Sequence, residues 1–118
     1  INPLLASGQV HGGVVQGAGQ TVFEQACYDD GGQLISGSLM DYAMPRASQL
    51  PDIEVSFNEV LDPNNELGVK GIGEGGACGA PPAIVNAVLD ALAPLGVTAV
   101  DMPLTSESIW RQIRAADT

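Results

Sequence analysis

The chain has 118 residues, of which 45% are hydrophobic and 15% are charged, a composition typical of a globular protein rather than a disordered one. Its formal net charge is -10, with only 4 Lys and Arg residues, which argues against a nucleic-acid-binding protein because phosphate contacts need clustered basic side chains. No run of about 18 apolar residues is present, so we predict no membrane span, and the length predicts a single domain over residues 1–118.

Residues 4–27 carry apolar side chains at spacings of three and four, which predicts an amphipathic helix. Each glycine inside a helix costs about 1 kcal/mol relative to alanine. The stretch nevertheless contains Gly8, Gly12, Gly13, Gly17 and Gly19. Glycines retained at that cost indicate that the helix backbone lies very close to something else. Either a packed helix or a bound ligand fits that role.

Short strands and further helices are predicted downstream. Residues 33–40 follow the turn signal at residues 29–32, residues 53–57 alternate apolar and polar side chains, and residues 97–102 form a short apolar run. Pro81 and Pro82 predict the start of a helix that runs to Leu92, because proline suits the first helical turn. Thr105 is a predicted N-cap for a last helix. These elements predict an α+β fold of mixed helices and short strands.

The most informative stretch is residues 70–82, where Glu74 lies among glycines at positions 71, 73, 75, 76 and 79. Glycine lets the main chain approach a ligand closely. A carboxylate held in such a loop, just before a helix, is a candidate general acid or base. An exposed glutamate in a flexible turn is the alternative, and composition alone does not separate the two.

Two segments around Glu74 closely resemble the C-terminal part of the molybdenum hydroxylases. They are Gly-Ile-Gly-Glu at residues 71–74 and Gly-Ala-Pro-Pro-Ala-Ile-Val-Asn-Ala-Val at residues 79–88. That family includes xanthine dehydrogenase, aldehyde oxidoreductase and the large subunit of aerobic carbon monoxide dehydrogenase. The Gly-Glu-Gly-Gly variant is most similar to carbon monoxide dehydrogenase-like large subunits that oxidise heterocycles and aldehydes.

The resemblance extends over nearly the whole chain. Residues 8–20 resemble the family's cofactor-contacting helix, and Met-Pro-Leu-Thr at residues 102–105, with Trp110 after it, resembles the usual C-terminal end. Because the family's large subunits are several times longer, the resemblance implies that residues 1–118 are a C-terminal fragment of a molybdenum-cofactor-binding domain.

The same resemblance implies a molybdenum-dependent oxidoreductase that is inactive as an isolated fragment. The complete subunit is expected to hydroxylate an electron-poor carbon of an aldehyde, an N-heterocycle or carbon monoxide with water. Glu74 matches the family's catalytic base, Gln16 matches a glutamine that bonds near the molybdenum ligands, and the cofactor-binding loop is matched by Gly71, Ile72 and Gly73.

The resemblance also implies the cofactor, the partners and the location. We expect a molybdenum–pyranopterin in its cytosine dinucleotide form, with FAD and [2Fe-2S] clusters on other subunits or domains. The expected partners are the rest of the large subunit, the iron–sulfur and flavin subunits and a small-molecule substrate, in the cytoplasm. No protein metal ligands are expected, because Cys27 and Cys78 form no CxxC pattern and His11 is the only histidine.

A different enzyme class fits part of the same stretch. Residues 71–76 also match the dinucleotide fingerprint GxGxxG, with Asp101 as a candidate ribose-binding acid. That motif needs a buried strand before its first glycine, whereas polar residues and a glycine interrupt residues 66–70. The helix is predicted from Pro81 rather than from the third glycine, and Glu74 would repel a pyrophosphate.

A non-catalytic assembly module is the remaining alternative. In that case the glycine-rich segments serve only for packing between protein segments. The position of Glu74 separates the two cases: a catalytic base would lie at a cavity open toward missing partner domains, whereas an assembly module would leave Glu74 solvent-exposed on a turn.

Overall fold

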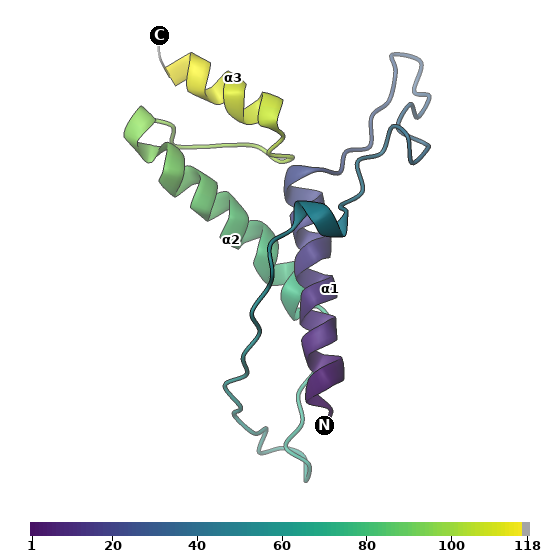
Figure 1. Cartoon of the computed structure of the whole chain (residues 1–118), viewed down its shortest axis with the longest axis vertical. Helices are drawn as coiled ribbons and strands as arrows, with labels where there is room; N and C mark the ends of the chain where they lie inside the picture. Colours follow the sequence, from purple (N-terminus) through teal and green to yellow (C-terminus); the bar gives the residue numbers. More distant parts are fainter. Residues whose placement is uncertain (117–118) are drawn as a thin grey trace.

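In the computed structural model, which describes residues 1–116, the chain forms three α-helices joined by long irregular segments (Figure 1). The helices are α1 (Pro3–Val22), α2 (Gly75–Leu92) and α3 (Ser106–Ala116), with 3-10 turns η1 (Ala47–Gln49) and η2 (Ala93–Leu95) between them. Helices α1 and α2 cross near the start of α2, and α3 begins near the C-terminal end of α1 (Figure 1). The crossing is the main tertiary contact of the described residues.

Helix α1 has a well-defined start. Asn2 Oδ1 accepts a hydrogen bond from Leu5 N at 3.1 Å, and Pro3 occupies the first turn, where its missing N–H is not needed. The helix ends at Val22, five residues before the predicted end at residue 27. It stops there because the N–H groups of Phe23 and Glu24 both bond to Gly19 O, at 2.9 and 2.8 Å.

Helix α2 begins at Gly75, so the predicted start at Pro81 is wrong. Pro81 and Pro82 lie inside the helix, although proline cannot donate the helical hydrogen bond. Packing on α1 accounts for this, since a Cβ added to Gly17 would lie 2.8 Å from both Ala80 Cβ and Pro81 Cδ. Tertiary contact therefore overrides the local proline signal.

The predicted strands do not form within residues 1–116, and the α+β class is not confirmed. The β pairing there is an isolated antiparallel bridge between Tyr28 and Leu34. Residues 53–56 do keep the predicted alternation, with Ile53 and Val55 half-buried between exposed neighbours, whereas Phe57 is exposed. A strand also needs a second strand to bond its N–H and C=O groups, and the described part of the chain places none beside this segment.

Two local predictions are confirmed. The turn at residues 29–32 forms, with Asp29 Oδ1 accepting from the N–H groups of Gly31 and Gln33 at 2.9 Å. Thr105 caps α3, because its Oγ1 accepts from Ser108 N at 3.1 Å. The segment before α3 is fixed to α1 by a hydrogen bond from Leu104 N to Thr21 O at 2.6 Å.

The fold is open. Its radius of gyration is 18.2 Å, against about 13.5 Å for a compact domain of this length. Its accessible surface is 8790 Å², against about 6000 Å² for a compact monomer of this mass. Helix α3 buries none of its residues. The buried apolar side chains are Ala18, Ala80, Leu92, Val97 and Leu104. Much apolar surface that a compact domain would cover is exposed, and the single domain over residues 1–118 stays a prediction.

The segment Gly75–Leu95 is long and apolar enough to cross a membrane, with a mean hydropathy of 1.3 over its best window. The sequence prediction named no such segment. Only 11% of that window is buried here. The same length and hydropathy are typical of a helix covered by other parts of a large protein, and the absence of a membrane span stays a prediction.

Candidate functional site

Glu74 is exposed and is the N-cap residue of α2, so the predicted place of this carboxylate directly before a helix is confirmed. Its backbone carbonyl accepts the first helical hydrogen bond, from Cys78 N at 2.9 Å. Its side chain does not cap the helix, and within residues 1–116 no hydrogen bond or ion pair reaches the carboxylate. Glu74 lines neither the hollow beside Gln16 nor the one beside Asp101, so residues 1–116 leave its carboxylate unpaired on an exposed turn.

Helix α1 fixes the backbone on both sides of Glu74. On the upstream side, Gln9 Nε2 donates to Gly73 O at 2.8 Å. On the downstream side, Gly76 is buried against α1, where an added Cβ would lie 2.7 Å from Val14 N. The main chain that carries the glutamate is therefore held by a neighbouring helix, although glycines surround it.

The glycines of the loop face open space. A Cβ added to Gly71, Gly73, Gly75 or Gly79 would meet no atom within 4 Å. Open glycines beside a free carboxylate leave the peptide groups accessible to a ligand.

The glycines of α1 are either packed against other parts of the chain or open to space. This bears on whether packing or a ligand explains them. Gly13 and Gly17 lie against α2, so helix packing explains both. Gly19 lies beneath Pro45 and the Glu24 side chain. Gly8 and Gly12 are open, with no atom within 4 Å of an added Cβ.

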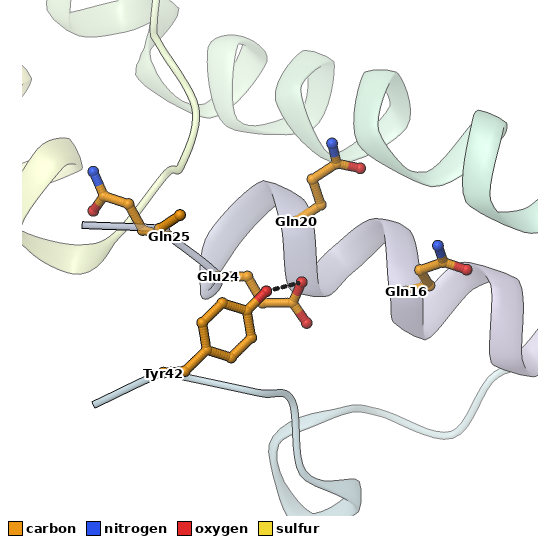
Figure 2. A pocket seen from close by; sticks show the side chains of 6 residues that line it. Gln16, Gln20, Glu24, Gln25 and Tyr42 are labelled. Atoms are coloured by element: carbon orange, nitrogen blue, oxygen red, sulfur yellow. Dashed lines mark hydrogen bonds between the residues drawn. The ribbon is translucent and has the colours of Figure 1, made fainter. Parts of the chain in front are cut away.

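No hydrogen bond joins Gln16 to the Glu74 loop within residues 1–116. Gln16 is exposed and lines a hollow of about 380 Å³ at the other end of α1, together with Gln20, Glu24, Gln25, Ala26 and Tyr42 (Figure 2). Figure 2 shows Gln16 and Gln20 on the same side of α1, with the Tyr42 ring beside Glu24. No hydrogen bond reaches the Gln16 amide within the described part of the chain.

The hollow contains one strong polar contact. Tyr42 OH donates to Glu24 Oε2 at 3.0 Å (Figure 2). This hydrogen bond raises the pKa of the Tyr42 hydroxyl above its ordinary value of 10.0, with smaller contributions from burial and from the negative charge of Glu24. The contact fixes the loop that follows α1 to the end of that helix.

Sequence reasoning assigned no role to Gln9, which is the side chain that contacts the Glu74 loop. One signal was available. Gln9 lies one helical turn before Gly13, and residues four apart share a face of a helix. Where a glycine allows two helices to cross closely, the residue four positions before it lies on the same face and can reach the segment next to the second helix.

The predicted helix start at Pro81, which spoke against a dinucleotide site, is wrong. Because α2 begins at Gly75, the third glycine of the fingerprint does lie in the first helical turn. The strand requirement still fails, because residues 66–72 form no strand. A dinucleotide site needs that strand to place its glycines.

Comparison with known proteins identifies what the chain is similar to. A family model described as "Molybdopterin cofactor-binding domain" matches residues 1–51. The nicotine 6-hydroxylase large subunit of Paenarthrobacter nicotinovorans is 43% identical over 111 residues, which cover 94% of this chain and 14% of that protein. The carbon monoxide dehydrogenase large chain of Hydrogenophaga pseudoflava is 37% identical over 114 residues, covering 97% of this chain and 14% of that protein.

A solved structure agrees in fold as well as in sequence. The crystal structure of quinoline 2-oxidoreductase from Pseudomonas putida 86 matches with a TM-score of 0.91 and 45% sequence identity, covering 97% of this chain and 14% of that one. The match includes the open arrangement of α1, α2 and α3. The chain therefore spans only a small part of the proteins that it resembles.

Proposed function

We propose, on the premise that the chain belongs to the molybdenum hydroxylase large-subunit family, that it supplies the catalytic base of such a subunit. The reaction class is hydroxylation of an electron-poor carbon with water. One observation carries the proposal: the Glu74 carboxylate has no partner in residues 1–116, while α1 holds the backbone on either side of it. A glutamate on a solvated, unsupported turn would not need that support.

The residues present fit a molybdenum–pyranopterin. Peptide groups at Gly71, Ile72 and Gly73 lie in a loop whose glycines face open space, which suits a planar cofactor lying against the main chain. Gln16 carries an amide that can both donate and accept, as the edge of a pterin requires.

When bound, the molybdenum centre would supply the redox step that removes an electron pair from the substrate carbon. The task left for this chain is proton transfer. A carboxylate oxygen of Glu74 would accept the proton from the water-derived oxygen that becomes part of the product. No ion pair inside residues 1–116 competes for the Glu74 carboxylate. The loop glycines let the substrate and the cofactor approach the carboxylate.

The rest of the site must come from outside this chain. Glu74 is exposed, and the chain has about 2800 Å² more accessible surface than a compact monomer of its mass. We propose that the remainder of the large subunit covers this surface and completes a cavity over Glu74, so the isolated chain is inactive. Flavin and iron–sulfur partners, the cytosine dinucleotide form of the cofactor and a cytoplasmic location belong to the same proposal.

The relatives indicate a first substrate class to test. Those at 43% and 45% identity are named for nicotine and quinoline, both of which contain an aromatic nitrogen ring. A carbon next to such a nitrogen is electron-poor. We therefore propose an N-heterocycle as the substrate, with aldehydes and carbon monoxide as the other members of the set.

The test is Glu74→Gln in the complete, assembled enzyme. The amide keeps the shape of the side chain but cannot accept the proton, so turnover should fall by about 10²–10⁴-fold while molybdenum content stays unchanged. Glu66→Gln is the matched control, because Glu66 is also exposed and lies in the same irregular segment. Near-normal turnover in Glu74→Gln would remove Glu74 from the catalytic role.

A further inference from the structure

We propose that Gln9 is a positioning residue for Glu74. Its side-chain amide holds the carbonyl of Gly73, the residue immediately before the glutamate. It thereby fixes the position of the backbone that carries the Glu74 side chain. The inference rests on the proposed role of Glu74 as the base. It assigns to α1 a direct part in the alignment of that base.

The contact is long-range and well formed. Gln9 Nε2 lies 2.8 Å from Gly73 O, although the two residues are 64 positions apart in the sequence. A distance of this size is within the range of a good N–H···O hydrogen bond. The bond therefore connects two segments that chain continuity does not hold together.

Little else restrains the loop upstream of Glu74. Gly71 and Gly73 have open space around them, and the backbone hydrogen bond of this turn, from Gly75 N to Ile72 O, is long at 3.3 Å. Glycine-rich backbone has more conformational freedom than any other. Without the Gln9 bond, the segment before Glu74 would be free to move away from α1.

Downstream of Glu74 the restraint is steric. Gly76 lies in backbone contact with α1, where an added Cβ would be 2.8 Å from Val10 O. Glu74 thus lies one residue after a hydrogen-bonded point and two residues before a packed one. A base must be aligned closely, since a misplacement of about 1 Å costs as much as 10²-fold in rate. Two fixed points supply that alignment while leaving the carboxylate itself unpaired.

The chemistry of the amide suits this role. A carbonyl oxygen only accepts, so the partner must donate, and a glutamine amide donates without carrying charge. A lysine or arginine at position 9 would donate too, but it would bring a positive charge beside a base that has to accept a proton. A glutamate at position 9 would have no proton to donate when ionised.

The experiment is a double-mutant cycle between Gln9→Met and Glu74→Gln in the complete enzyme. Methionine has a similar length and no donor. Gln20→Met is the matched control, because Gln20 is an exposed glutamine of the same helix and forms no hydrogen bond within residues 1–116. Three quantities are measured: kcat, KM, and deuterium uptake by the backbone of residues 71–77. Molybdenum content is recorded for each variant.

We expect Gln9→Met to lower kcat per bound molybdenum by about 10-fold to 10²-fold, with KM unchanged. The double variant should be no slower than Glu74→Gln alone, because the amide acts only through the glutamate. Deuterium uptake over residues 71–77 should rise in Gln9→Met and not in Gln20→Met. If Gln9→Met does not fold, Gln9→Asn takes its place, since it keeps the amide but is too short to reach Gly73 O.

Unchanged deuterium uptake, or a double variant as slow as the two single effects multiplied, overturns the positioning role. Loss of molybdenum in Gln9→Met with unchanged uptake overturns it as well, because the amide would then act elsewhere. Full turnover in Glu74→Gln is a separate result: it refutes the proposed base, whatever the uptake shows for Gln9.

Discussion

Gly13 of α1 and Gly76 of α2 lie in backbone contact at the crossing of the two helices. A Cβ added to Gly13 would lie 3.0 Å from Ala77 N, and one added to Gly76 would lie 2.7 Å from Val14 N. Gly76 has no room for a side chain, and Gly13 has room for one only if the facing backbone shifts by a few tenths of an ångström. The crossing therefore depends on glycine in both helices, and it places the start of α2, with Glu74 before it, against α1.

The crossing predicts opposite effects for two glycines of α2. Gly76→Ala should destabilise the fold by about 1–3 kcal/mol, because the methyl group meets backbone atoms that cannot turn aside. Gly79→Ala should stabilise it by up to about 1 kcal/mol, because Gly79 is open and alanine favours the helix. Thermal melting of the purified chain, followed by circular dichroism, measures both. A melting temperature that moves in the same direction for both variants would contradict the crossing geometry.

Local signals predicted the parts of this fold whose causes are local. The cap at Thr105 and the turn at Asp29 depend on hydrogen bonds between neighbours in the sequence, and both form as predicted. The start of α2 was misplaced because its cause is packing of Gly76 and Pro81 on α1, which the sequence does not display. The strand predicted at residues 53–57 failed for a related reason, because its pairing partner is not in the described part of the chain.

Of the residues of the candidate site, the sequence predicted those with a local signal and missed the one that depends on tertiary contact. Glu74 was predicted from its glycine-rich surroundings, and its place before a helix is confirmed. Gln9 was missed because its role appears only when α1 meets a loop 64 residues away in the sequence. Gln16 was selected through a family match, and it lines the hollow with Glu24 and Tyr42.

The hydrogen bond between Tyr42 and Glu24 predicts a late tyrosine titration. The neutral phenol donates to the carboxylate, so the pKa of Tyr42 in the folded chain is raised above 10.0. The stabilisation from this bond is fully present below the unfolded pKa near 10, and it is lost as the pH rises through the higher folded pKa. Tyrosinate absorbance measured as the difference between the parent and Tyr42→Phe isolates this group.

Glu24→Gln supplies the control for that titration. The amide can still accept the hydrogen bond but carries no charge, so the Tyr42 pKa should move back toward its ordinary value without reaching it. A Tyr42 that ionises at its ordinary pKa of 10.0 in the parent would show that the contact is not formed in solution.

The last prediction concerns Gln16, whose proposed contact is with the cofactor rather than with this chain. Gln16 is exposed and its amide has no hydrogen-bond partner in residues 1–116. Removing it should therefore cost the fold almost nothing, whereas most costly substitutions break a packed or bonded group. In the assembled enzyme, Gln16→Ala should lower the molybdenum content or the rate while leaving the melting temperature unchanged. Glu74→Gln should show the reverse pattern of full molybdenum content and lost turnover. Normal molybdenum content and rate in Gln16→Ala would remove Gln16 from the site and leave the cofactor contacts to the Gly71–Gly73 loop.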